Sequence, residues 1–267
     1  MASVAGDAQD RDVSVGRVFG RAFGTLASNP VATLGIAFLF GALPSLLIAY
    51  GMQILRAEDF TSAGGFALAA IGIASVLLSV VLAMITQGAL VRATVAYSEG
   101  GKASFAESAM AGLGVAWRLL LLGIVSALGI ALGFLLIFVP GIILYIMWSV
   151  AAPALVEERL GPIEALGRSS DLTSGVRWKV FGLSLVVLVI YWLFSALVAM
   201  LSMRWYGGVT EFAEASAGSL PLGYLVINGI SGTVTSAVWG VIQTSLYVEL
   251  RDWKDGPATQ ALAEIFG

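Results

Sequence analysis

The sequence predicts an all-α polytopic membrane protein with six transmembrane helices in three hairpins, each preceded by a short amphipathic interfacial helix. Hydrophobic residues make up 58% of the 267-residue chain and charged residues only 12%, whereas soluble domains carry about a quarter charged residues. The mean hydropathy is +0.93. Because so few charges cannot cover a water-exposed surface, most of the outer surface is expected to face lipid.

Runs without charged residues locate the spans, since a helix needs about 20 apolar residues to cross the hydrocarbon core. The runs are Val31–Leu55, Phe60–Val91, Leu119–Val156, Val180–Met203 and Ala215–Val248.

The third run contains 38 residues, which is too long for one span and suits two. Pro140-Gly141 lies inside it, and proline removes a backbone donor while glycine permits turn dihedrals. This pair is therefore predicted to be the hinge of a tight helical hairpin. The second arm, Ile142–Val156, is short and carries Pro153, so a re-entrant hairpin is the alternative.

Three segments that precede spans have helical, amphipathic spacing. In the first, apolar residues recur on one face from Val15 to Leu26, before Asn29-Pro30. The second, Ser104–Leu113, begins with Ser and Glu spaced as a capping box. The third, Pro162–Ser174, has proline at a first-turn position and is followed by Gly175 as a C-terminal cap. All three are expected to lie along the cytoplasmic interface.

These segments divide the chain into three similar units. The prediction is a disordered cytoplasmic tail at 1-12, one six-span membrane domain at 13-255 and a cytoplasmic tail at 256-267. The repeat units cover about 13-97, 103-156 and 161-250, and their likeness lies in hydropathy more than in residue identity.

Orientation follows from the lysines and arginines. Twelve lie in the two terminal segments and in the second and fourth connections, whereas Arg56 and Arg204 lie on the opposite side. The positive-inside rule therefore predicts that both termini are cytoplasmic. Acidic residues before a full-length first span argue against a cleavable signal peptide.

The residues for catalysis are sparse. The chain has no His and no Cys, so it lacks the commonest general base, imidazole ligands and thiol nucleophiles. The acidic pairs Glu58-Asp59 and Glu157-Glu158 are better explained as solvated span boundaries than as metal ligands. No enzyme activity, cofactor, metal or nucleic-acid partner is predicted.

No ionisable residue lies inside a predicted span, where transporters often carry one. The polar residues cluster on the sixth span, and hydrogen bonding between helices explains them more simply than a substrate path does. The candidate intramembrane path consists of Gln87, Asn228, Thr235 and Gln243. Close helix packing is predicted from small residues at Gly123-Ala127-Ala131, Ser75-Ser79-Ala83 and Gly232-Ser236-Gly240.

Tryptophan recurs beside cations at the predicted cytoplasmic boundary. Interfacial anchoring explains this pattern, and binding of anionic lipid headgroups or of a protein partner is the more specific hypothesis. The candidate surface contains Arg118, Arg168, Arg177, Trp178, Lys179 and Arg251.

Residues 130–190 resemble a family of bacterial inner-membrane proteins that includes the YciC-like proteins and the membrane domain found beside some glycerophosphoryl diester phosphodiesterases. The matching residues are Pro140, Gly141, Pro153, Glu157, Gly161, Ala165, Ser169, Leu172, Gly175 and Trp178. The resemblance implies a six-helix membrane protein and brings no reaction, because the phosphodiesterase chemistry belongs to a separate soluble domain.

Three functions remain open from the sequence. The favoured one is a scaffold, accessory or lipid-interacting protein that works through its cytoplasmic face. The alternative is a transporter or pore for an apolar or lipid-like molecule, and an intramembrane enzyme ranks third. A cavity lined by Asn228 and Gln243 would favour transport, and a fully packed bundle would favour the scaffold.

Overall fold

The computed structural model describes residues 13–57, 62–136, 138–205 and 222–256, and this part of the chain consists of helices joined by turns, without β-strands. Six helices in it are long and apolar enough to cross a membrane. The prediction of an all-helical, multi-pass membrane protein is therefore confirmed. The predicted tails, apart from Gly256, and the Glu58-Asp59 pair lie outside the described residues.

The first span consists of three helical segments. The separate helix α1 (Val15–Ser28) precedes it, and Asn29 accepts a hydrogen bond from the Ala32 N–H at the start of α2 (Pro30–Ile36). A π-helical turn, η1 (Ala37–Ala42), then leads into α3 (Leu43–Ala57). Pro44 gives the physical reason for this turn, because it has no N–H for the carbonyl of Phe40 and its ring would crowd that carbonyl in a regular α-helix.

The second and third spans are long continuous helices, α4 (Ser62–Ser98) and α5 (Phe105–Leu136). The predicted capping box is present, since Ser104 and Glu107 exchange backbone-to-side-chain hydrogen bonds at 2.8 and 3.2 Å. The separate surface helix predicted at Ser104–Leu113 is nevertheless absent, because α5 continues into the span. A Cβ on Gly112 would lie 2.2 Å from the Ile85 carbonyl oxygen, so this part of α5 packs directly on the α4 backbone.

The fourth span is broken in its middle. Helix α6 (Phe138–Met147) and α7 (Ala151–Glu157) are separated by a turn at 148–150. Pro140 and Gly141 are not the hinge that was predicted, because α6 begins at Phe138 and both residues lie in its first turn. Gly141 instead allows close packing, because its Cα lies 3.0 Å from the position of a Cβ on Gly133 of α5.

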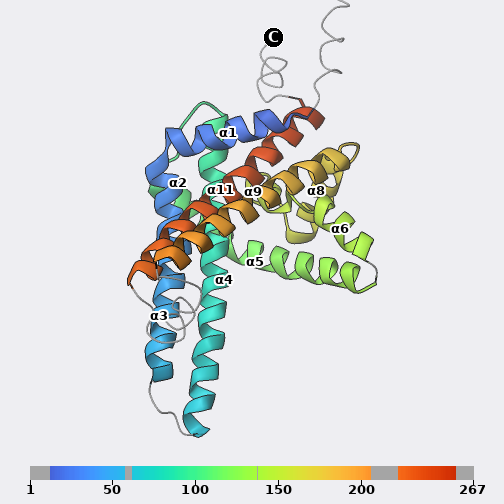
Figure 1. Ribbon diagram of the computed structural model, residues 1–267. Helices are drawn as coiled ribbons and strands as arrows, with labels where there is room; N and C mark the ends of the chain where they lie inside the picture. Colours follow the sequence, from blue (N-terminus) through green and yellow to red (C-terminus); the bar gives the residue numbers. More distant parts are fainter. Residues whose placement is uncertain (1–12, 58–61, 137, 206–221, 257–267) are drawn as a thin grey trace, which may run out of the picture.

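Helix α8 (Pro162–Thr173) precedes the last two spans, α9 (Arg177–Trp205) and α11 (Leu222–Lys254). As predicted, Pro162 opens α8 and Gly175 follows its end with a positive φ of 87°. Helix α11 contacts α1, η1 and α4, and it forms the centre of the fold (Figure 1). Helix α9 buries only Val180, Leu183 and Ser202, so it is the least enclosed span.

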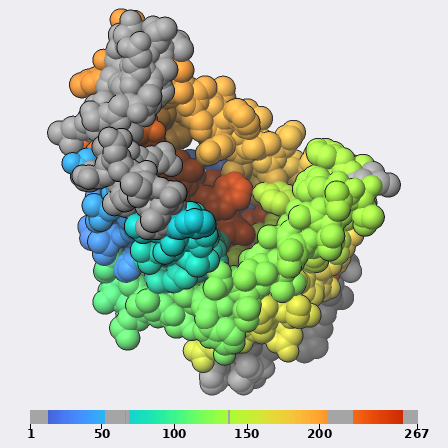
Figure 2. All heavy atoms as spheres, turned by 90° about the horizontal axis from the view of Figure 1, so that it is seen from below, coloured from blue at the N-terminus to red at the C-terminus, as the bar shows by residue number. Residues whose placement is uncertain are grey.

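The ends of the helices are arranged differently on the two sides of the fold. Near α1, α8 and the end of α11 the helices converge, whereas the facing ends of α3 and α4 lie far from the facing ends of α5 and α6 (Figure 1). From below, α11 is visible at the floor of a hollow between α5 and α9 (Figure 2). This divergence leaves room for cavities between α9 and the other helices.

Candidate functional site

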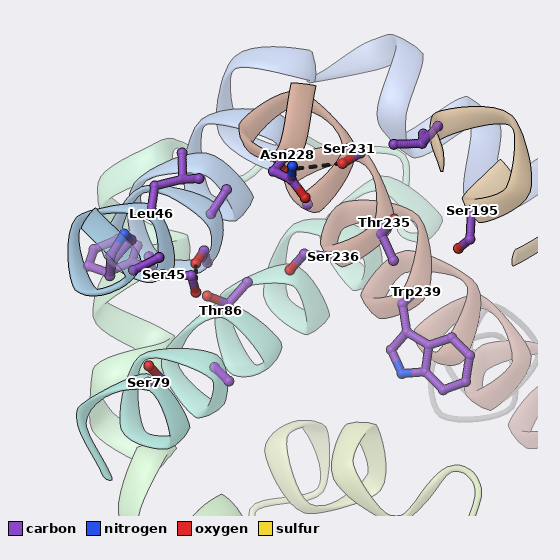
Figure 3. Close-up of a pocket in the computed structure, with 18 of the residues that line it drawn as sticks. Ser45, Leu46, Ser79, Thr86, Ser195, Asn228, Ser231, Thr235, Ser236 and Trp239 are labelled. Carbon is purple, nitrogen blue, oxygen red and sulfur yellow. Dashed lines mark hydrogen bonds between the residues drawn. The ribbon is translucent and has the colours of Figure 1, made fainter. Parts of the chain in front are cut away.

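A cavity of about 880 Å³, which we call the large cavity, lies between η1, α3, α4, α9 and α11. Polar side chains line it from several helices, with Ser195 of α9 lying across from Thr235 and Trp239 of α11 (Figure 3). No described residue that lines it is charged. Its size falls within the range of ligand pockets, about 300–1,000 Å³.

Several hydroxyl groups in the wall of this cavity donate their protons to the backbone and not to the cavity. Ser45, Thr86 and Ser202, for example, donate to backbone carbonyls of their own helices at 2.8–2.9 Å. Asn228 likewise uses its amide N–H on the Tyr224 carbonyl at 2.9 Å. Because a hydroxyl or amide oxygen keeps acceptor capacity when its proton is used, the wall presents hydrogen-bond acceptors to the cavity.

A second cavity of about 210 Å³ lies between α5, α6, α9 and α11, beneath the hollow of Figure 2. Tyr145, Trp148, Trp239 and Gln243 contribute to its wall. On α9 it is lined by residues 183–187 and the large cavity by residues 191–202. The two cavities therefore follow one another along α9 and α11.

The structure distributes the four predicted path residues between these cavities. Asn228, Thr235 and Gln87 line the large cavity, and Gln243 lines the small one. The Gln87 amide donates to the Gln243 carbonyl, and Gln243 donates to the Ser149 backbone carbonyl at 2.6 Å. All four residues line cavities, and Gln87 and Gln243 also form hydrogen bonds between helices.

The turn at 148–150 was not predicted, and its backbone groups are held by two other helices. Ser169 of α8 donates to the Met147 carbonyl at 2.7 Å and accepts from the Val150 N–H at 3.2 Å. Gln243 of α11 binds the Ser149 carbonyl. Non-helical backbone at membrane depth requires such partners, so the polar residues of α8 and α11 explain how the break is tolerated. The signal in the sequence was Pro153, which occupies the first turn of α7.

The convergent side of the fold carries a network of ion pairs, which we call the charged base. Its first part surrounds Glu249, whose side chain is 4% exposed. Arg17 lies 2.7 Å and Arg21 3.6 Å from this carboxylate, and the Ser14 N–H donates to it at 3.1 Å. Arg21 also lies 3.5 Å from Asp252. The charged base comprises Arg17, Arg21, Glu158, Arg168, Asp171, Glu249, Asp252, Lys254 and Asp255.

The second part of the charged base surrounds Arg168. Its Nε donates to Glu158 at 2.9 Å, and its guanidinium also pairs with Asp255 and Asp171. The hydrogen bonds to Asp255 and Glu158 raise the pKa of Arg168 above its ordinary value. The Tyr247 hydroxyl donates to Glu158 at 2.9 Å. Arg168 thus joins α8 to the ends of α7 and α11, and its charge is already matched by three carboxylates.

The remaining residues of the predicted lipid or partner surface have different surroundings. Arg177, Trp178 and Lys179 are exposed at the start of α9, with Trp178 at 84%. Arg118 lies over the Trp117 ring at 5.8 Å, and Arg251 lies over the Tyr247 ring at 5.6 Å. The six residues therefore have different contacts: Arg168 lies within the charged base, Arg118 and Arg251 lie over aromatic rings, and the start of α9 is exposed.

Among the described residues, no group of three or more Asp or Glu side chains is placed to hold a metal ion. Within the Glu157-Glu158 pair, Glu158 belongs to the charged base, where it pairs with Arg168. No protein-family model, curated protein or solved structure matches the chain.

Proposed function

We propose that this integral membrane protein binds an uncharged, hydroxyl-bearing amphiphile in the large cavity and acts as a carrier for it, without catalysing a reaction. The observation that carries the proposal is a neutral, acceptor-rich cavity between the least enclosed span and the rest of the fold. The diverging helix ends leave the bundle incompletely packed, which the scaffold hypothesis does not require.

The chemistry of the wall selects the ligand class. Acceptor oxygens suit a headgroup with hydroxyl donors, and rings such as Phe40, Phe194 and Trp239 suit its apolar part. A phosphate or carboxylate would enter without a cation to pair with, and burying an unpaired charge is costly. A diacylglycerol has the required features, namely one hydroxyl group, two acyl chains and no net charge.

We place the protein in a bacterial inner membrane with both termini and the charged base in the cytoplasm. The twelve-to-two distribution of cations supports this orientation. We further propose that α1 and α8 lie along the interface. Val18 and Ala22 of α1 are buried against the protein while Phe23 is 57% exposed, so an apolar side chain is available to the headgroup region.

One specific observation still favours the scaffold hypothesis. Trp178 is largely exposed between two exposed cations, a combination suited to anchoring α9 in the interface or to contact with a protein partner. Arg168 does not support this role, since its guanidinium is occupied within the charged base. Membrane lipids and a cytoplasmic partner would therefore meet the start of α9.

The absence of cysteine from the chain allows a direct test of the cavity. Thr235→Cys places one thiol in the wall, and Leu193→Cys places a control thiol on α9, where the native side chain is 67% exposed. Both variants are purified in detergent and treated with a water-soluble thiol reagent, with and without dioleoylglycerol.

We expect dioleoylglycerol to slow modification at position 235 and to leave modification at position 193 unchanged. Dioleoylphosphatidylglycerol, which carries a phosphate, should protect position 235 much less. Equal protection by both lipids, or equal effects at both positions, would contradict a site for an uncharged amphiphile.

A further inference from the structure

We infer that the two cavities are consecutive sites on one path along α9 and α11, and that the Gln87–Gln243 bridge is a gate between them. This inference rests on the proposed function of the large cavity. Gln87 lines the large cavity and Gln243 the small one, and their side chains are hydrogen-bonded to each other. Trp239 lines both cavities. Gln87 and Gln243 therefore separate the two cavities and are also part of the cavity walls.

The bridge is built so that one half can move while the other stays fixed. Gln243 is held independently, because its amide donates to the Ser149 carbonyl at 2.6 Å. The Gln87–Gln243 bond joins two side chains, so rotation of Gln87 opens it without unwinding a helix. Side-chain rotation is fast compared with rearrangement of helices. A hydroxyl donor on the ligand can replace the Gln87 N–H at the Gln243 carbonyl, which compensates the bond that opening breaks.

The small cavity has features of a second binding site. Its wall includes Ser126, Ser184 and Tyr145 as well as the unwound turn of the fourth span. Ser126 and Ser184 donate to the Gly123 and Val180 carbonyls of their own helices at 3.2 and 2.9 Å. Their oxygens therefore keep acceptor capacity, as in the large cavity. The second site therefore takes the same ligand class as the first.

The charged base closes the path beyond the small cavity. Leu246 lines that cavity, and the next residue, Tyr247, donates to Glu158, which pairs with Arg168. A ligand moving from the large cavity therefore meets the amide bridge first and an ion-paired closure second. The path has two barriers of different strength, a single neutral hydrogen bond and a network of charges.

The test measures access to the small cavity through the gate. Ser184→Cys places a thiol in its wall, and right-side-out membrane vesicles are treated with a membrane-impermeant cationic methanethiosulfonate. The gate is opened by Gln87→Ala or by Gln87→Asn, whose shorter amide is expected not to reach Gln243. The matched control is Ser79→Ala, which removes a polar group from the same helix and the same cavity wall.

Both Gln87 variants should raise the rate of modification at position 184 by roughly tenfold, as expected when one neutral hydrogen bond no longer holds the barrier. Ser79→Ala should leave the rate unchanged. An unchanged rate in both folded Gln87 variants would overturn the gate. Loss of dioleoylglycerol protection at Thr235→Cys in the otherwise native chain would instead overturn the proposed function, so the two failures are distinguishable.

Discussion

The charged base and the large cavity use polar side chains in opposite ways. In the charged base, Glu249 and Arg168 each contact several oppositely charged groups from other segments of the chain. In the cavity, Ser45, Thr86 and Asn228 bond back to their own helices and connect nothing. Polar groups that join helices stabilise the fold, and polar groups that satisfy themselves leave a surface for a ligand. Mutations on the two sides should therefore separate stability from binding.

The largest effect on stability is expected at Glu249. Glu249→Gln removes the buried carboxylate that Arg17 and Arg21 share. Because Arg17 is 56% exposed and Arg21 also pairs with Asp252, the cost should be about 2 kcal/mol. The thermal unfolding temperature in detergent should fall sharply, and Glu99→Gln, a change at an exposed glutamate, should have little effect. Similar unfolding temperatures for the two variants would contradict the claim that the charged base stabilises the fold more than an exposed surface charge does.

A smaller loss is expected at Arg168. Arg168→Gln removes the guanidinium shared by Glu158 and Asp255, and because the Arg168 side chain is 23% exposed, solvent reduces the cost to about 1–2 kcal/mol. Arg168→Lys should restore only part of the stability, since a lysine cannot reach all three carboxylates in the guanidinium geometry. Urea or thermal unfolding in detergent measures both variants, and full restoration by lysine would contradict the multidentate role.

Filling the cavity should abolish ligand binding and leave stability almost unchanged. Thr235→Phe adds an apolar ring to open space, so stability should change by no more than about 0.5 kcal/mol. Protection by dioleoylglycerol of a thiol at Ser231→Cys, another wall position, should be lost in this background. The control Leu193→Phe should keep protection. A Thr235→Phe variant that retains protection would place the ligand elsewhere.

The smallest effect on stability is expected at Arg177 and Lys179. The double variant with glutamine at both positions removes two exposed cations, and the free energy of unfolding should change by less than about 0.5 kcal/mol. Comparison with Arg168→Gln separates the loss of ion pairs in the charged base from the loss of exposed cations. If the start of α9 meets anionic lipid or a partner, that binding should weaken in the double variant, and its lipid component should also weaken with added salt.

Composition and hydropathy were sufficient to predict the helical membrane fold, because spans are set by length and apolarity. Local caps were predicted equally well, as at Ser104, Pro162 and Gly175, since they depend on neighbours in sequence. The π-turn before Pro44 and the break after Met147 were missed. The break depends on partners from distant helices, Ser169 and Gln243, which spacing alone does not identify. The π-turn follows from Pro44, a local signal that a search for charge-free runs does not detect.

Contacts between helices at small residues were also predicted only in part from their spacing in the sequence. A Cβ on Gly240 would lie 2.6 Å from Leu90, as expected for one of the predicted steps. Gly123 has nothing within 4 Å of its Cβ position, so that step does not mark a contact in the described structure. The candidate path was predicted as residues but not as two cavities, because the divergence of α9 from α4 and α5 is a tertiary property.

The central claim is that the large cavity holds an uncharged amphiphile, and native mass spectrometry tests it most directly. The protein is incubated with dioleoylglycerol, released from detergent in the gas phase and compared with Thr235→Phe and Leu193→Phe. We expect the native chain and Leu193→Phe to retain one bound lipid and Thr235→Phe to lose it. Equal retention by all three proteins, or none by the native chain, would contradict the account.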